Sequence, residues 1–157
     1  MQEVTIDPDM LGKAHKQAKE LGVVYRSVTQ GFGNVAGFVG EHMAQKLYGG
    51  KLENTFKYDL ILPDGRRMDV KTKRVKFKPI DSYECSISAY QIDYDCDGYI
   101  FVRVMHSLKS GWVLGDISKR DFKIKSVLHK TGERDPDNGF VFRSACYNVP
   151  IGELNPI

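Results

Sequence analysis

Residues 58–75 read YDLILPDGRRMDVKTKRV, and this stretch decides the fold that we predict. Two runs rich in apolar and β-branched residues flank Pro63-Asp64-Gly65, which is a turn signal, so we expect a β-hairpin. Side chains alternate between the two faces of a strand. The charged face of the second strand is therefore expected to carry Arg67, Asp69, Lys71 and Lys73.

The length of the hairpin loop decides whether two aspartates meet. If residues 63–65 form a three-residue loop, Leu60 faces Met68 and Asp59 faces Asp69 across the strands. A two-residue loop would set Leu60 against Asp69 and would place a leucine on the charged face. The hydrophobic pattern favours the three-residue loop, which brings the two aspartate Cβ atoms to about 4.5–5.5 Å from each other.

Two carboxylates at this distance, with Lys71 two residues beyond Asp69, indicate a particular chemistry. Neighbouring acids repel each other unless a metal ion or another cation relieves them. Oxygen ligands that are open to water suit Mg²⁺ or Mn²⁺, and such an ion can activate a water and stabilise a phosphate under attack. The alternative is a surface hairpin with cross-strand charge pairs, which an Asp-x-Lys triplet alone would favour. The wider pattern of the chain favours the metal site.

The order of four short motifs resembles that of a known family. These motifs are Gly40-Glu41 in an expected helix, Tyr58-Asp59 before the turn, Asp69-Val70-Lys71 after it, and Gln91 in an expected short helix. Over roughly residues 36–105 this order is similar to the PD-(D/E)XK nuclease superfamily. The resemblance implies a restriction-endonuclease-like α/β fold, in which helices flank a central mixed β-sheet.

The resemblance also implies site residues and a cofactor. The metal ligands that it implies are Asp59, Asp69, the carbonyl of Val70 and, as an outer acidic ligand, Glu41. The ion would be Mg²⁺, for which Mn²⁺ can substitute. Lys71 would position or polarise the attacking water, and Gln91 would support the lysine or the scissile phosphate.

The chain departs from the family pattern just before the first aspartate. Tyr58 precedes Asp59, where the family motif has a proline. A literal Pro-Asp pair occurs at Pro63-Asp64, but these residues form the expected turn. Because Asp64 would lie at the hairpin tip, it could not face Asp69 on the same surface.

A basic run follows the candidate metal ligands. Residues 71–78 carry five basic side chains, which could follow a phosphate backbone. The alternative is an edge strand whose lysines prevent aggregation. The candidate DNA contacts are Arg66, Arg67, Lys73, Arg74, Lys76, Lys78, Arg26 and Asn34.

The rest of the chain alternates helical and strand patterns. The expected helices are residues 9–21 with Asp9 as N-cap, residues 36–48, a short helix over 89–95, and one begun by Asp116 or Ser118. The expected strands are residues 82–88, the highly apolar and therefore central run 98–105, residues 112–114, and residues 140–144.

Bulk properties limit the domain organisation. With 157 residues, 41% of them hydrophobic, the chain can bury one core but is short for two ordinary domains. We expect one nuclease domain over residues 1–157, with its motifs in 36–105 and a C-terminal extension over 106–157. The net charge of +3 permits a nucleic-acid partner without requiring one. Three cysteines without CxxC spacing indicate reduced thiols rather than a zinc ribbon.

Two classes of partner are not expected. No apolar run reaches the roughly 20 residues that cross a bilayer, and residues 1–7 lack the features of a signal peptide. We therefore expect a cytoplasmic protein without membrane contact, at the nucleoid or, if a phage encodes it, in the host-cell cytosol. Residues 31–36 fit the dinucleotide fingerprint GxGxxA, but no repeated βαβ pattern follows, so no nucleotide cofactor is expected.

These features together predict a Mg²⁺-dependent endonuclease that hydrolyses phosphodiester bonds in DNA. By resemblance, it would leave a 5′ phosphate and act as a homodimer. Two substrates stay open, namely branched four-way-junction DNA and a specific duplex sequence. The alternative function is a DNA-binding or assembly module with a nuclease fold but no cleavage, against which the full set of Asp59, Asp69 and Lys71 argues.

Overall fold

A mixed β-sheet forms the centre of the molecule. The structure is a computed structural model that describes residues 1–21, 34–53, 55–135 and 139–157. Within these residues, six strands form one sheet in the order β1-β7-β6-β4-β3-β2. Their bounds are β1 Gln2–Thr5, β2 Lys51–Leu52, β3 Leu60–Ile61, β4 Arg67–Val75, β6 Gly98–Met105 and β7 Ser110–Ser118. β4 and β6 are parallel, and the other neighbouring pairs are antiparallel.

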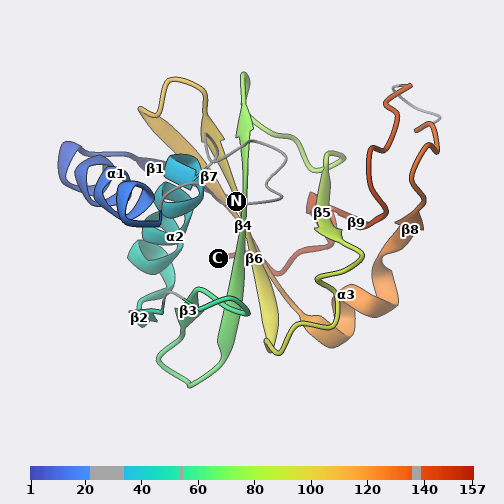
Figure 1. The fold of residues 1–157 in the computed structure, drawn as a ribbon, viewed down its shortest axis with the longest axis horizontal. Coiled ribbons are helices and arrows are strands. Elements are labelled where there is room, and N and C mark those ends of the chain that lie inside the picture. The colour runs from blue at the N-terminus through green and yellow to red at the C-terminus, as the bar shows by residue number, and fades with distance from the viewer. Residues whose placement is uncertain (22–33, 54, 136–138) are drawn as a thin grey trace.

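A smaller antiparallel sheet and several helices cover the central sheet. The small sheet has the order β5-β9-β8, with bounds β5 Glu84–Ser88, β9 Cys146–Pro150 and β8 Val127–His129. The helices are α1 Pro8–Leu21, α2 Asn34–Tyr48, α3 Lys119–Lys125 and the 3₁₀ turn η1 Ile151–Glu153. Figure 1 shows α1 and α2 on one side of β4 and β6, and α3 with the small sheet on the other. The fold is therefore of the mixed α/β class that the sequence predicts.

β6 is buried on both faces, as a strand between two covering layers must be. Ile100, Val102 and Val104 belong to the apolar cluster beneath α1 and α2. Tyr99 and Phe101 belong to a second cluster, which packs against α3 and the small sheet. The prediction of a central strand over residues 98–105 is confirmed.

The hairpin between β3 and β4 has the predicted register. Leu60 lies opposite Met68, and the N–H of Leu62 donates to the carbonyl of Arg66 at 2.9 Å. Gly65 adopts a φ of 90°, a conformation that a side chain would strain. The three-residue loop is therefore confirmed, and with it the separation of apolar and charged faces along β4.

α1 begins with a different cap from the one predicted. The N–H of Met10 donates to Oδ1 of Asp7 at 2.9 Å, so Asp7 rather than Asp9 is the N-cap. Pro8 then occupies the first helical position, where its missing N–H leaves no helical bond unmade. Among the described helices, none combines the length and the hydrophobicity needed to cross a bilayer.

Two predicted elements are wrong, and one is confirmed. Residues 89–95 form turns instead of a helix, because ion pairs from Asp93 to Lys123 and from Asp95 to Arg67 hold this segment against other elements. The last long strand is β9, not residues 140–144, because pairing with both β5 and β8 selects it. Ser118 caps α3 as predicted, since its Oγ accepts from the N–H of Asp121 at 3.0 Å.

Candidate active site

The candidate site lies where β3 leaves the edge of β4. β6 pairs with β4 along Met68–Val75, whereas the described pairing with β3 covers only Arg67 and Met68. The N–H of Asp59 donates to the carbonyl of Met68 at 3.0 Å, and the described residues before Asp59 do not pair with β4. Among the described residues, the alternate backbone groups of β4 that point away from β6, beginning with those of Val70, therefore have no strand partner, and side chains can take its place.

The carboxylate of Asp59 fills the first place along this edge. Its Oδ2 accepts the N–H of Val70 at 2.8 Å, which is the bond that a continued β3 would have made with a backbone carbonyl. The predicted strand pairing of Asp59 directly opposite Asp69 is therefore wrong in detail, because β3 begins only at Leu60. The two acids still lie near enough for the charge of Asp69 to raise the pKa of Asp59.

Asp69 and Lys71 lie on the face of β4 that the alternation predicts. Nζ of Lys71 lies 2.8 Å from Oδ2 of Asp69 and donates to Oε1 of Gln91 at 3.2 Å. Asp69 is 5% exposed, and apart from the ion pair its Oδ2 accepts no hydrogen bond from the described residues. A buried carboxylate oxygen with spare acceptor capacity is well suited to bind a cation.

Glu41 reaches the same edge from the helical layer. Gly40 lies so close to β4 that a Cβ there would overlap Oγ1 of Thr72, so a residue without a side chain is needed for α2 to approach the strand. The next residue, Glu41, is half-buried beside the acids. We refer to Glu41, Asp59, Asp69, Lys71 and Gln91 together as the edge site.

Burial and mutual repulsion raise the pKa values of two of these acids. The pKa of Asp59 rises to about 8, mainly through burial and then through the charges of Glu41 and Asp69. The N–H of Val70 and the ammonium of Lys71 oppose this shift only in part. The pKa of Glu41 rises to about 7, through burial and the charge of Asp69. One lysine does not neutralise the cluster, so an additional cation would relieve it.

The donor set fits a hard divalent cation. Among the described residues, no three His, Cys, Asp or Glu side chains lie close enough together to enclose a metal ion. Mg²⁺ usually takes only one or two carboxylates and completes its shell with water and substrate phosphate. Asp59 and Asp69 supply two carboxylates, and the carbonyl of Val70 points to the same edge as its N–H.

The structure places the predicted DNA contacts in different environments. Arg66 pairs with Asp64 at 2.7 Å, and Arg67 pairs with Asp95 at 2.9 Å and with Asp97 at 3.3 Å. The charge of Arg67 is therefore directed to two carboxylates. Exposed side chains are found at Lys73, Arg74, Lys76 and Lys78. Asn34 is the first residue of α2, and Arg26 lies outside the described residues, as does the first half of the fingerprint segment 31–36.

A groove of about 700 Å³ begins at the same face of β4 and extends to the small sheet. Lys73 lines it together with Arg103, which is 5% exposed and donates from Nη2 to the carbonyl of Glu84 at 2.7 Å. Arg103 is not among the site residues predicted from the sequence. The available signal was one arginine in the otherwise apolar run 98–105.

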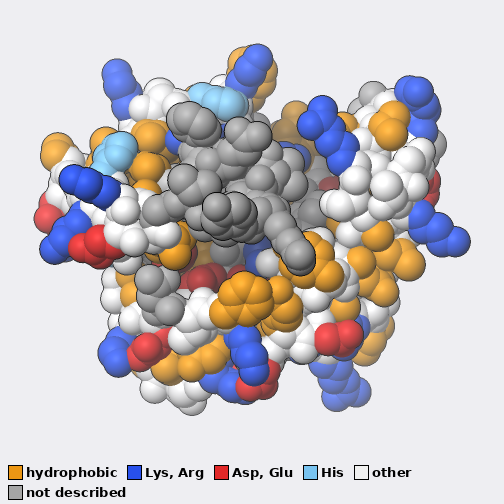
Figure 2. Space-filling model, in the orientation of Figure 1, with side chains coloured by type: hydrophobic (Ala, Val, Ile, Leu, Met, Phe, Trp, Pro, Cys, Tyr) orange, Lys and Arg blue, Asp and Glu red, His pale blue; other side chains and the backbone are white. Residues whose placement is uncertain are grey.

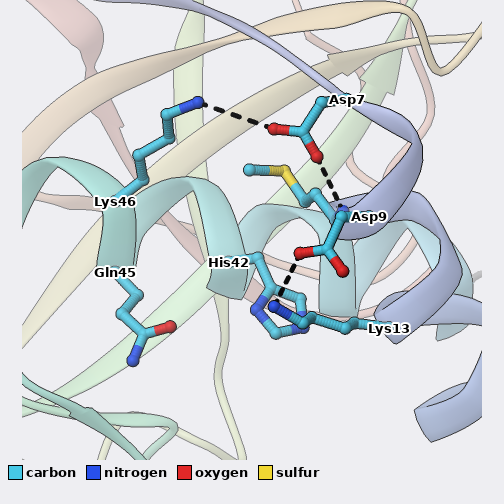
Figure 3. A pocket seen from close by; sticks show the side chains of 7 residues that line it. Asp7, Asp9, Lys13, His42, Gln45 and Lys46 are labelled. Atoms are coloured by element: carbon cyan, nitrogen blue, oxygen red, sulfur yellow. Dashed lines mark hydrogen bonds and ion pairs between the residues drawn. The ribbon is translucent and has the colours of Figure 1, made fainter.

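A second charged pocket lies between α1 and α2 (Figure 3). Figure 3 shows Lys13 reaching Asp9 and Lys46 reaching Asp7, with N–O distances of 2.7 Å and 3.8 Å. The paired side chains are all about half exposed or more. The bond from the Met10 N–H lowers the pKa of Asp7. We refer to these four residues as the helix-end cluster; helix capping and surface ion pairs account for it.

The structure thus brings Glu41, Asp59, Asp69 and Lys71 together, and Gln91 joins them through the lysine. A comparison with models of known protein families gave no match. A comparison with curated protein sequences gave no match either. The chemistry of the edge site is therefore the basis for a function.

Proposed function

We propose that this protein is a metal-dependent endonuclease that hydrolyses phosphodiester bonds in DNA. The observation that carries the proposal is the meeting of three acids and a lysine at the open edge of β4. Asp59 is fixed there by the N–H of Val70, and Asp69 is paired with Lys71. Buried acids with raised pKa values destabilise a fold, so their presence favours a functional role.

Each side chain has a distinct role in this proposal. Asp59, Asp69 and the Val70 carbonyl would hold Mg²⁺ or Mn²⁺, with Glu41 as an outer ligand. The bound ion would lower the pKa of a water and neutralise charge on the phosphate. In this proposal, water and a phosphate group would reach these donors along the edge of β4.

Lys71 would act on the attacking water. Its ammonium carries three N–H donors, of which one faces Asp69 and one faces Gln91. The third can be donated to the attacking water or to a phosphate oxygen. Gln91 is then a positioning residue, because it holds the lysine without touching the reacting atoms.

The rest of the molecule supports DNA as the substrate. Exposed basic side chains continue from the edge site along β4 and the following segment, and Lys73 shares the face of Asp69 and Lys71. In this proposal, Lys73, Arg74, Lys76 and Lys78 would contact phosphates of the DNA. We propose that two copies act as a homodimer, each cutting one strand, in the cytoplasm of the cell that makes the protein.

The test is a cleavage assay with matched substitutions. Supercoiled plasmid and a labelled four-way junction are incubated with the purified protein in Mg²⁺, in Mn²⁺ or in EDTA. We expect cutting with either metal and none in EDTA. Lys71→Ala should abolish cutting, whereas Asp64→Ala should not, because Asp64 lies exposed at the hairpin tip and pairs with Arg66.

Two results would contradict the proposal. Cutting that persists at the wild-type rate in Lys71→Ala would exclude the edge site as the catalytic centre. If the wild-type protein binds both DNAs and cuts neither with either metal, the chain is a DNA-binding or assembly module instead.

A further inference from the structure

Three aromatic side chains, two of them exposed and one half-buried, lie next to the edge site. Phe56 is 84% exposed and Tyr90 is 71% exposed, which is unusual for such large rings. The ring of Tyr94 lies between them, with centroids 5.3 Å from Phe56 and 6.3 Å from Tyr90. We call these three residues the aromatic platform. Figure 2 shows hydrophobic side chains gathered near the centre of one face, close to acidic ones.

The turn that carries Tyr94 is held from several sides. The carbonyl of Tyr94 accepts a hydrogen bond from Nζ of Lys119 at 2.5 Å. The residues on either side of it, Asp93 and Asp95, pair with Lys123 and Arg67 at 2.8 and 2.9 Å. Tyr94 is therefore fixed by contacts to α3 and β4, and little conformational entropy is lost when a ligand binds its ring.

Phe56 is held by a separate turn. Oγ1 of Thr55 accepts from the N–H of Tyr58 at 3.0 Å and donates to its carbonyl at 2.6 Å. These bonds close a loop around Phe56 and leave its ring at the surface. Two independently fixed segments thus place their rings in contact, which is typical of a prepared stacking surface.

The aromatic platform is joined to the catalytic groups by short connections. The N–H of Tyr94 donates to the carbonyl of Gln91 at 3.0 Å, and Gln91 holds Lys71 through its side chain. On the other segment, Phe56 precedes Asp59 by only three residues. A strand whose phosphate lies at Lys71 would therefore have a neighbouring base within reach of the rings.

We infer that the aromatic platform stacks unpaired bases, so that the enzyme selects DNA with single-stranded nucleotides beside the cleavage site. In intact duplex DNA both faces of each base are covered by its neighbours, so the rings have no partner. An unpaired base offers a free face, and stacking on a protein ring stabilises binding whatever the base. The inference rests on the proposed function and specifies its substrate as single-stranded or branched DNA.

The test measures binding without cleavage. A labelled single strand and a duplex of the same sequence are titrated with protein in EDTA, and fluorescence anisotropy gives the two affinities. Phe56→Ala combined with Tyr90→Ala should weaken single-strand binding about 5- to 100-fold and leave duplex binding unchanged. Both side chains are largely exposed, so the fold should tolerate their loss.

Two further variants make the result specific. Ile124→Ala removes a large hydrophobic side chain of comparable exposure, 70%, outside the aromatic platform and should change neither affinity. Phe56→Trp should restore single-strand binding, because tryptophan keeps a stacking face. With 2-aminopurine in the single strand, the wild-type protein should change the fluorescence of the base, and the double variant should not.

The inference is overturned if the double variant keeps wild-type affinity for the single strand, or if it weakens both DNAs equally. It is also overturned if the wild-type protein binds no single strand. Because no metal is present, these outcomes do not depend on cleavage. Preferential binding of the single strand without cutting in Mg²⁺ would instead remove the proposed function and leave a single-strand-binding surface.

Discussion

Two groups of charged residues flank α2, and they differ in what their surroundings do to an acid. In the helix-end cluster, the acids are exposed and each faces a lysine. In the edge site, one lysine serves three acids, and Asp69 is 5% exposed. Residue types alone therefore do not identify a reactive site, because both groups contain aspartate and lysine.

The direction of the pKa shifts expresses this difference. The pKa of Asp7 is lowered, since the N–H of Met10 stabilises its charged form. The pKa of Asp59 is raised to about 8, since burial and the neighbouring acids destabilise its charged form. The first arrangement stabilises the folded chain as it stands, whereas the second becomes favourable when a cation binds.

The largest expected difference between the two groups is in cleavage. Asp69→Asn should lower the cleavage rate by about 10²- to 10⁴-fold, because it removes a charged ligand from the candidate metal site. Asp9→Asn, which breaks the pair with Lys13, should leave the rate unchanged. Initial rates of plasmid nicking in Mg²⁺ measure both. An equal loss of cleavage rate in Asp69→Asn and Asp9→Asn would contradict a catalytic role that is specific to the edge site.

The next largest effect is expected on the cleavage rate when Gln91 is replaced. Gln91→Ala should lower the cleavage rate about 10- to 100-fold, as is typical when a partner that orients a catalytic group is lost. DNA affinity in EDTA should stay the same. The matched control is Gln45→Ala. Gln45 lies beside the helix-end cluster and donates to the carbonyl of Gly50. If Gln91→Ala cleaves no more slowly than Gln45→Ala, the hydrogen bond from Lys71 to Gln91 does not contribute to cleavage.

Two glycines of α2 differ in their surroundings, because Gly40 faces β4 and Gly37 does not. Gly40→Ala should destabilise the fold by about 1–3 kcal/mol, because the new methyl group meets Thr72 and must displace the helix or the strand. At Gly37, no atom of the described residues outside the helix's own backbone lies within 4 Å of an added methyl group, so Gly37→Ala should stabilise the helix by about 0.5–1 kcal/mol. Urea unfolding measures both changes, which should have opposite signs.

The pH dependence of stability gives a smaller effect. The raised pKa of Asp59 means that the folded chain keeps a proton that the unfolded chain releases near pH 4. This contribution to stability is present at low pH and is lost as the pH rises toward 8. In EDTA at pH 9, Asp59→Asn should therefore be more stable than wild type by about 1–2 kcal/mol, and the gain should shrink toward pH 4.

The asparagine keeps an oxygen that can accept the N–H of Val70, so only the charge is removed. Thermal melts from pH 4 to pH 9 follow the change, with Asp9→Asn as the control, for which we expect no pH-dependent gain. A gain for Asp59→Asn that is largest at low pH would contradict the sign of the raised pKa.

Local pattern predicted the hairpin well because both signals lie within a few residues of each other. The alternation of Met68 and Val70 with Asp69 and Lys71 fixes which side chains share a face. The turn ending at Gly65 fixes the register. The helix over residues 89–95 failed for the opposite reason, since ion pairs with residues 28 and 30 positions away hold that segment in turns.

Side-chain periodicity and turn chemistry were enough to predict the two long helices, the central strand and the hairpin register. The candidate catalytic residues could also be named from the sequence. The tertiary structure decided how those residues meet. Because β3 begins only at Leu60, the carboxylate of Asp59 accepts the N–H of Val70 in place of a strand carbonyl. The close contact of Gly40 with Thr72 brings Glu41 to the same edge. Only packing between distant segments sets burial and charge proximity, and these two quantities shift the pKa values of the acids.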